Sequence, residues 1–244
     1  MSPTLNYVDL HSHILPGIDD GSPDLATSMA MIEGLVNLGF STICATPHQK
    51  EGQYLPSFEA IDDAYKKVLD EVSSRDLAVT IPLAAENMWD STFFERLSTD
   101  AIPSYDNGAA FLMEFVPNQL PMGLFDHIFD LRRKGKLPVV AHPERYAPLW
   151  KDPETVAKLA ADCAMVVDLG ALAGDHGRKQ AKYARKMVLE GIAHAAASDA
   201  HTPDDIESAQ KGMAWIEKKA GAAALKRLLA TNPAKILAGE HPEG

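Results

Sequence analysis

The chain has 244 residues, of which 46% are hydrophobic and 23% are charged, and its formal net charge is −11 at pH 7. This length and composition suit one large α/β domain over residues 1–244, and no apolar run reaches the length needed to span a bilayer. The acidic balance argues against nucleic acid as a partner, because phosphate backbones require clustered lysine and arginine.

The N-terminal segment and the cysteines indicate the compartment. Residues 1–7 contain no basic residue and no apolar segment, so we expect no signal peptide. Cys44 and Cys163 lie inside apolar runs, which favours reduced, buried thiols over a disulfide framework. We therefore expect a cytoplasmic protein.

Short apolar runs alternate with longer amphipathic runs along the chain, which is typical of βα units. The expected strands are apolar almost throughout, as strands covered on both faces should be, and they span residues 7–11, 41–48, 79–86, 109–115, 137–144, 164–170 and 192–201. The expected helices lie between them, at residues 22–39, 57–74, 123–135, 153–163, 177–191, 206–221 and 223–232.

The ends of the first two helices carry recognisable signals. Ser22 is the expected N-cap of the first helix, with Pro23 at its first helical position and Gly39 at its end. Ser57 is the expected N-cap of the second helix. The connection over residues 87–108 is polar, aromatic and turn-rich, so we expect it to be largely loop.

Titratable residues stand at the C-terminal ends of the expected strands. The motifs lie 37, 38, 28, 28 and 57 residues apart, the last interval spanning two units, which is the repeat expected of βα modules. In a (β/α) barrel all strand C-termini surround one mouth, so these side chains should form one ring in space. They are His11, His13, His48, Glu86, Glu114, His142, Asp199 and His201.

Such a ring predicts bound cations. Burying charged groups side by side costs several kcal/mol unless they pair or hold a metal, and Arg145 is the one matching cation that we place at these strand ends. Asp20 adds a ninth candidate ligand, and five histidines with four carboxylates are too many for one ion and enough for three. Nitrogen and oxygen donors without thiolate favour Mn, Fe or Zn.

The remaining histidines are expected to lie outside this ring. His127 falls within a helical pattern, His194 precedes the core of the last strand, and His241 is in the tail, so we interpret all three as structural or solvated. His176 follows the sixth strand, but no partner residue is evident for it, and we do not include it in the site.

The motifs DLHSHILPGIDDG, ATPH, AEN, MEF, AHPER and SDAH follow one another in this order between Asp9 and His201. Together they resemble the polymerase and histidinol phosphatase (PHP) superfamily, and within it the metal-dependent protein tyrosine phosphatases of bacterial capsule and exopolysaccharide operons (CpsB/CapC/YwqE type). The resemblance implies a distorted, seven-stranded (β/α) TIM-like barrel that holds three divalent ions, usually Mn. It also implies a phosphotyrosine protein as substrate, namely a bacterial tyrosine kinase of polysaccharide synthesis.

The resemblance further assigns a role to each candidate residue. It implies that His11 and His13 bind the first metal and that Glu86 bridges the first metal to a second. Glu114 and His142 would hold the second metal, and Asp20, His48 and His201 would hold the third. Asp199 would contact the first metal or bridge two metals. Arg145 matches a family arginine expected to contact substrate phosphate. Of the two neighbouring aspartates, the family pattern favours Asp20 over Asp19 as the ligand.

Two segments depart from the family pattern close to the phosphate. The sequence TPDDIES follows SDAH, and no arginine or lysine occurs there before Lys211, whereas the family usually has an arginine. The turn after ATPH reads QKEGQY, where relatives more often continue with His or Asn. Both departures concern phosphate binding rather than the metal ligands.

The chemistry that we expect is in-line attack on phosphorus by metal-activated hydroxide, with Arg145 and the metals neutralising the phosphate oxygens. A cysteine nucleophile is excluded, because Lys50 and Leu169 stand where a C-x5-R loop would place arginine. Three alternatives remain: a small-molecule phosphomonoesterase of the histidinol phosphatase type, an amidohydrolase, and a binding module that keeps metals for structure. The amidohydrolase reading is weakened by Glu114, which stands where that family commonly has a carboxylated lysine.

Overall fold

The computed structural model describes residues 6–242, so the signal-peptide expectation, which rests largely on residues 1–5, lies mostly outside the described residues. Residues 6–242 contain eight strands, and every ladder between them is parallel. The strands are β1 (Tyr7–Ser12), β2 (Phe40–Ala45), β3 (His48–Gln49), β4 (Glu86–Met88), β5 (Ala110–Glu114), β6 (Leu137–Ala141), β7 (Ala164–Asp168) and β8 (Ala195–Ala197).

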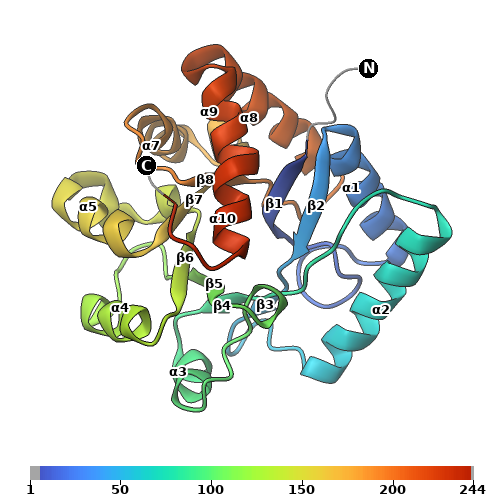
Figure 1. The fold of residues 1–244 in the computed structure, drawn as a ribbon, viewed down its shortest axis with the longest axis horizontal. Helices are drawn as coiled ribbons and strands as arrows, with labels where there is room; N and C mark the ends of the chain where they lie inside the picture. Colours follow the sequence, from blue (N-terminus) through green and yellow to red (C-terminus); the bar gives the residue numbers. More distant parts are fainter. Residues whose placement is uncertain (1–5, 243–244) are drawn as a thin grey trace.

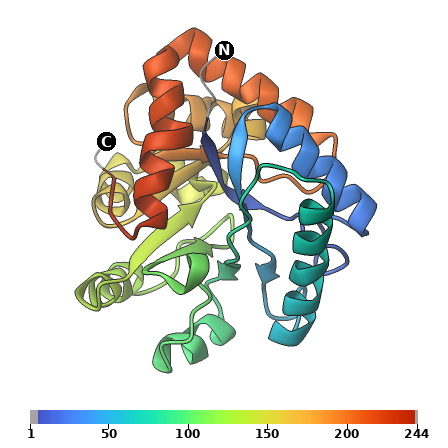
Figure 2. The same ribbon diagram turned by 45° about the vertical axis from the view of Figure 1, so that its right-hand side comes forward.

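Helices surround these strands on the outside (Figures 1 and 2). They are α1 (Leu25–Asn37), α2 (Phe58–Ser74), α3 (Ser91–Ser98), α4 (Leu124–Arg133), α5 (Pro153–Asp162), α6 (Leu169–Ala173), α7 (Arg178–Leu189), α8 (Asp205–Ala220), α9 (Ala222–Lys226) and α10 (Asn232–Leu237). The expected α/β class with parallel strands is confirmed. None of the helices within residues 6–242 is both long and apolar enough to cross a lipid bilayer.

The strand ladders differ from the seven continuous strands that we expected. β1 and β2 form one sheet, and β3 to β8 form a second sheet in chain order. The expected strand 41–48 is divided into β2 and β3 around Pro47, and most of the expected strand 79–86 makes only isolated bridges to β2. Pro47 and Pro82 have no N–H group to donate to a ladder, which explains both interruptions.

Backbone hydrogen bonds outside the ladders join the two sheets. The His13 N–H donates to the Ala200 carbonyl (2.9 Å), and the Asp199 N–H donates to the His11 carbonyl (2.9 Å). On the other side, the Ala84 N–H, just before β4, donates to the carbonyl of Ala45 in β2 (2.9 Å). The first and last strands therefore lie next to each other, although they are far apart in sequence.

The strands bury apolar side chains on both faces, as their composition predicts. Alternate residues point inward and form one core that includes Leu10, Leu112 and Val139, with Ile236 of α10 packed against it. The other faces pack against the surrounding helices in a larger core. Cys44 and Cys163 are both buried and free, in agreement with the sequence.

The last expected helix, 223–232, is replaced by α9, a π-helical turn at Arg227–Thr231 and α10, which ends at Leu237, and α6 begins inside the expected strand 164–170. The other expected helices lie within two residues of their predicted bounds except at the start of α1. There Asp24, not Ser22, is the N-cap, because its side chain accepts from the Thr27 N–H while the Ser22 hydroxyl donates to the Asp24 carbonyl. Ser57 caps α2 as expected. The connection over residues 87–108 is less of a loop than expected, because the end of β4, α3 and a 3-10 turn at Tyr105–Asn107 take up most of it.

Candidate metal centre

All nine predicted ligands come together at the C-terminal ends of the strands. They form four overlapping groups, and within each group the donor atoms lie within 4.8 Å of one another. The groups are His13, Asp20, His48 and His201; His11, Glu86 and His142; His11, His13 and Asp199; and His48, Glu86 and Glu114. The grouping differs from the implied one in three respects. His13 also joins Asp20, Glu114 joins His48, and His142 lies with His11 and not with Glu114.

Glu86 occupies the centre of this arrangement. Its Oε1 lies 2.8 Å from His142 Nε2, and its Oε2 lies 3.3 Å from His11 Nε2 and 2.9 Å from His48 Nδ1. Burial raises the pKa of Glu86, but contact with His11 and the other histidines outweighs burial and holds this pKa well below its usual value. The side chain is therefore an anion aimed at several ring nitrogens.

The loop after β1 separates the roles of its two aspartates. Asp19 Oδ2 lies 2.8 Å from His13 Nδ1 and accepts the His48 backbone N–H, so it orients the ring of His13. Asp20 instead directs Oδ1 towards His48 Nε2, at 3.3 Å. The next residue must be glycine, because a Cβ at Gly21 would lie 2.3 Å from the His13 carbonyl oxygen.

Two candidate ligands have a left-handed backbone that side chains other than glycine rarely adopt. His142 has φ 34° directly after β6, and Asp199 has φ 49° two residues after β8. Strained residues of this kind are concentrated at functional sites, where the surrounding structure holds them. Each turn directs its side chain into the strand-end cluster, where Asp199 Oδ1 lies 3.3 Å from His11 Nε2.

Several polar atoms of the cluster are buried but make no hydrogen bond. These atoms test whether the cluster is suited to bind cations. Within the described residues, His48 Nδ1, Glu86 Oε2, Glu114 Oε2 and Asp199 Oδ1 are buried and have no hydrogen-bond partner. His48 Nδ1 and Glu86 Oε2 are close to each other but make no hydrogen bond. Because unpaired buried polar atoms are costly, four of them among nine N and O donors fit bound divalent ions.

A second basic side chain, Lys50, lies beside Glu114 and was not expected from the sequence. Lys50 Nζ, two residues beyond His48, lies 3.8 Å from Glu114 Oε2, so Arg145 is not the only cation at these strand ends. Burial and the charge of Glu86 nevertheless raise the pKa of Glu114 to about 7. A neutral carboxyl group would release its proton when it becomes a metal ligand.

Arg145 reaches the cluster from the turn after β6. Its Nη2 donates to Asp168 Oδ2 (2.7 Å) and also to Asp199 Oδ2, and its side chain is 28% exposed. The guanidinium thus contacts one candidate metal ligand, Asp199, and also faces the opening. This position is compatible with the predicted contact to phosphate.

The expectation that His176 has no partner is wrong. Its Nε2 lies 2.7 Å from Asp168 Oδ2, and both residues line a cavity beside Asp199 and His201. Asp168 ends the apolar run of β7 just as the predicted ligands end theirs, so the sequence carried a signal for it. The loop that returns His176 to this edge has no such signal.

The other three histidines lie outside the cluster, as expected. His127 packs its ring against Trp89 and Phe94. His194 is buried, and its Nδ1 accepts the Met165 backbone N–H. His241 is hydrogen-bonded to a backbone carbonyl near the C-terminal end of the described chain.

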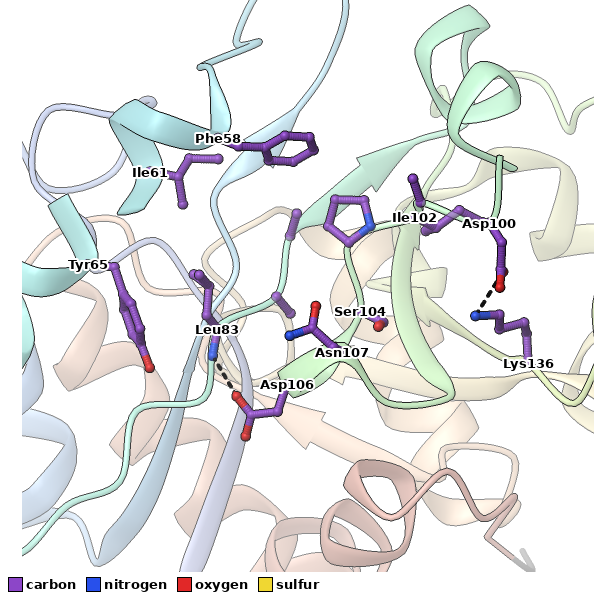
Figure 3. Close-up of a pocket in the computed structure, with 14 residues that line it drawn as sticks. Phe58, Ile61, Tyr65, Leu83, Asp100, Ile102, Ser104, Asp106, Asn107 and Lys136 are labelled. Carbon is purple, nitrogen blue, oxygen red and sulfur yellow. Dashed lines mark hydrogen bonds and ion pairs between the residues drawn. The ribbon is translucent and has the colours of Figure 1, made fainter. Parts of the chain in front are cut away.

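A separate cavity of about 630 Å³ lies at the opposite ends of the strands, between α2 and the loop before β5 (Figure 3). None of its lining residues is a candidate ligand. Its charged groups are already paired, since Lys136 lies 3.0 Å from Asp100 and Asp106 accepts the Leu83 N–H. The metal-binding potential therefore belongs to the strand C-termini.

Known proteins resemble this chain along nearly its whole length. Residues 7–238 match the family described as capsular polysaccharide synthesis, CpsB/CapC. The tyrosine-protein phosphatase YwqE of Bacillus subtilis is 30% identical over 195 residues, covering 80% of this chain and 77% of YwqE. The tyrosine-protein phosphatase CpsB of Streptococcus pneumoniae is 26% identical over 244 residues, covering 94% of this chain and 98% of CpsB.

Solved structures agree with the sequence matches. A structure from a crystallographic study of YwqE and CpsB, described there as unique metal-dependent tyrosine phosphatases, has a TM-score of 0.87 at 27% identity and covers 97% of this chain and 96% of its own. Histidinol phosphate phosphatase from Lactococcus lactis has a TM-score of 0.55 at 13% identity, covering 86% and 93%, which shows the fold alone. The family resemblance of the motifs is confirmed, and the chain belongs to the CpsB/CapC family of capsular polysaccharide synthesis.

Proposed function

We propose that this chain is a metal-dependent protein tyrosine phosphatase that acts in the control of capsule or exopolysaccharide synthesis. The observation that carries the proposal is the convergence of five histidines and four carboxylates on one edge, with unpaired buried donor atoms among them. The relatives add the substrate class, since YwqE and CpsB are named tyrosine-protein phosphatases.

The nine residues are proposed to hold up to three divalent ions, with Mn preferred and Fe or Zn as alternatives. The ligands are His11, His13, Asp20, His48, Glu86, Glu114, His142, Asp199 and His201. Bound divalent ions lower the pKa of water and neutralise phosphate charge, which is the chemistry that phosphate ester hydrolysis requires. Asp19 orients His13 towards the ions through its 2.8 Å contact with Nδ1.

Arg145 is the proposed catalytic residue of the chain itself. Its guanidinium is fixed on two carboxylates and partly exposed, so its remaining N–H groups can donate to the equatorial oxygens of a phosphate. Such donors stabilise the charge distribution of the transition state without moving. The leaving group is a tyrosine phenolate, which needs little protonation because of its low basicity.

The finer features of fold and partner are part of the same proposal. The shared inner core and the hydrogen bonds between β1 and the segment after β8 support closure of the strands into a distorted barrel. The proposed macromolecular substrate is a phosphotyrosine-bearing tyrosine kinase of polysaccharide synthesis. Two buried, free cysteines are compatible with a reducing, cytoplasmic location.

Rates on two classes of phosphate ester test this function. Protein loaded with Mn is assayed on a phosphotyrosine peptide, on histidinol phosphate and on a sugar phosphate. We expect the peptide to have the highest kcat/KM and chelation to abolish its hydrolysis. Preference for histidinol phosphate would favour the small-molecule phosphomonoesterase instead, and metal-loaded protein inactive on every ester would favour a binding module.

A further inference from the structure

A cavity of about 350 Å³ opens directly beside the candidate metal centre, at the C-terminal end of β7. Asp199 and His201 form one side of it, and Arg145, Asp168 and His176 form another. Asp168 is the last residue of β7, and its side chain is 1% exposed. It is a buried carboxylate that belongs to none of the metal-binding groups.

One oxygen of Asp168 contacts two basic side chains at once. Its Oδ2 accepts from Arg145 Nη2 at 2.7 Å and lies 2.7 Å from His176 Nε2. Surface ion pairs contribute little, but here the shared carboxylate is buried, which makes the pairing geometrically specific. Arg145 and His176 are thereby held side by side at the rim of the cavity.

Asp168 is itself fixed from the backbone side. Its Oδ1 accepts the Gly170 N–H at 2.6 Å, and its own N–H donates to Glu144 Oε1 at 3.0 Å. Gly170 leaves room for the histidine ring, because a Cβ there would lie 3.0 Å from His176 Nε2. The position of His176 therefore depends on the fixed carboxylate of Asp168 and on the absence of a side chain at Gly170.

Arg145 and His176 face a cavity whose lining also includes the acidic residues Asp175 and Asp205. The segment after His201 contributes Thr202, Asp205 and Ser208 to the lining, and none of them is basic. The side chain of His176 is 41% exposed, and its hydrogen bond to Asp168 raises its pKa. With Nε2–H donating to Asp168, protonation of Nδ1 gives the ring a second N–H group that can donate to a ligand.

We infer that His176 is a further substrate-binding residue, which together with Arg145 binds the anionic oxygens of the substrate phosphate. Asp168 is the positioning residue that holds both cations. The role rests on the proposed phosphatase function, and it supplies a second cation that the segment after SDAH does not. His176 donates a charged hydrogen bond and takes part in no bond making or breaking.

The test compares His176→Gln, which loses the charge, with His176→Arg, which restores a cation. Each metal-loaded variant is assayed for kcat and KM on a phosphotyrosine peptide and for binding of inorganic phosphate by calorimetry. We expect phosphate binding and kcat/KM to fall by roughly tenfold to a hundredfold in His176→Gln, the loss of one hydrogen bond to a charged group. His176→Arg should recover most of that loss.

Two further variants separate binding from folding. Gly170→Ala favours helix formation in α6 and crowds the ring of His176, so it should weaken phosphate binding as His176→Gln does, at normal metal content. Lys182→Gln removes an exposed cation of α7 outside this cavity and should change neither quantity.

Unchanged phosphate binding in His176→Gln would overturn the inference, as would loss of metal from that variant. A wild type that binds phosphate but hydrolyses no phosphotyrosine peptide would refute the proposed function alone. In that case, weaker phosphate binding in His176→Gln would still support the second cation.

Discussion

Replacing Glu86 by glutamine removes one negative charge from the centre of the candidate metal site and keeps the size of the side chain. Glu86 is 1% exposed, and its two oxygens lie between 2.8 and 3.5 Å from ring nitrogens of four histidines. If those atoms surround cations, glutamine weakens the binding of those cations. The metal-induced change in stability isolates this effect, because each variant is compared with its own metal-free form.

The expected size follows from mass action. At a free metal concentration of 100 times Kd, binding stabilises the folded state by about 2.7 kcal/mol. For a chain of this size that free energy corresponds to a rise in Tm of roughly 5–11 °C. Changes around a metal ligand weaken binding about 10–100-fold, and a hundredfold loss leaves about 0.4 kcal/mol, or roughly 1–2 °C.

Thermal unfolding with and without Mn measures this difference directly. Glu207→Gln is the matched control, because it removes an exposed carboxylate of α8 that pairs with Lys211 across one helical turn. The control should keep the wild-type shift, whereas Glu86→Gln should lose most of it. An equal shift in both variants would refute the placement of Glu86 among metal ligands.

Three further changes test other parts of the site and the fold. Arg145→Ala should lower kcat/KM on phosphate esters about 10–100-fold at unchanged metal content, and loss of metal on elemental analysis would instead assign Arg145 a structural role through Asp199. Gly21→Ala should lower the free energy of unfolding by about 2 kcal/mol or more, because its Cβ would lie 2.3 Å from the His13 carbonyl oxygen; an unchanged urea midpoint would contradict the packing. Burial, followed by the charge of His241, lowers the pKa of His194 to about 4, so between its unfolded pKa of about 6.5 and pH 4 only the unfolded chain takes up this proton and stability falls with falling pH. His194→Gln should reduce the loss between pH 7 and 4.5 by roughly 2–3 kcal/mol in urea titrations, and an identical pH dependence would show that His194 titrates normally in the folded protein.

The placement of the candidate ligands was predictable because the sequence marks strand ends directly. His48, Glu86 and Glu114 each lie at or near the end of an apolar run, and the C-termini of parallel strands meet at one edge. Chain order then suffices to bring distant residues together. Their role as metal ligands stays a prediction until ions are measured.

Details that depend on the path of a loop could not be predicted in the same way. Asp168 ends an apolar run, but only the fold shows that the loop between α6 and α7 returns His176 to it. Ser22 and Asp24 are both good helix caps two residues apart, and the choice depends on which side chain reaches Thr27. The two prolines that interrupt the strands are visible in sequence, but not the bridges that replace the ladders.

The most direct test of the central claim is elemental analysis of the untreated protein, with the same sample assayed on a phosphotyrosine peptide before and after chelation. We expect up to three divalent ions per chain, hydrolysis that chelation abolishes, and recovery when Mn is restored. Metal-free protein that hydrolyses the peptide at the same rate before and after chelation would contradict it.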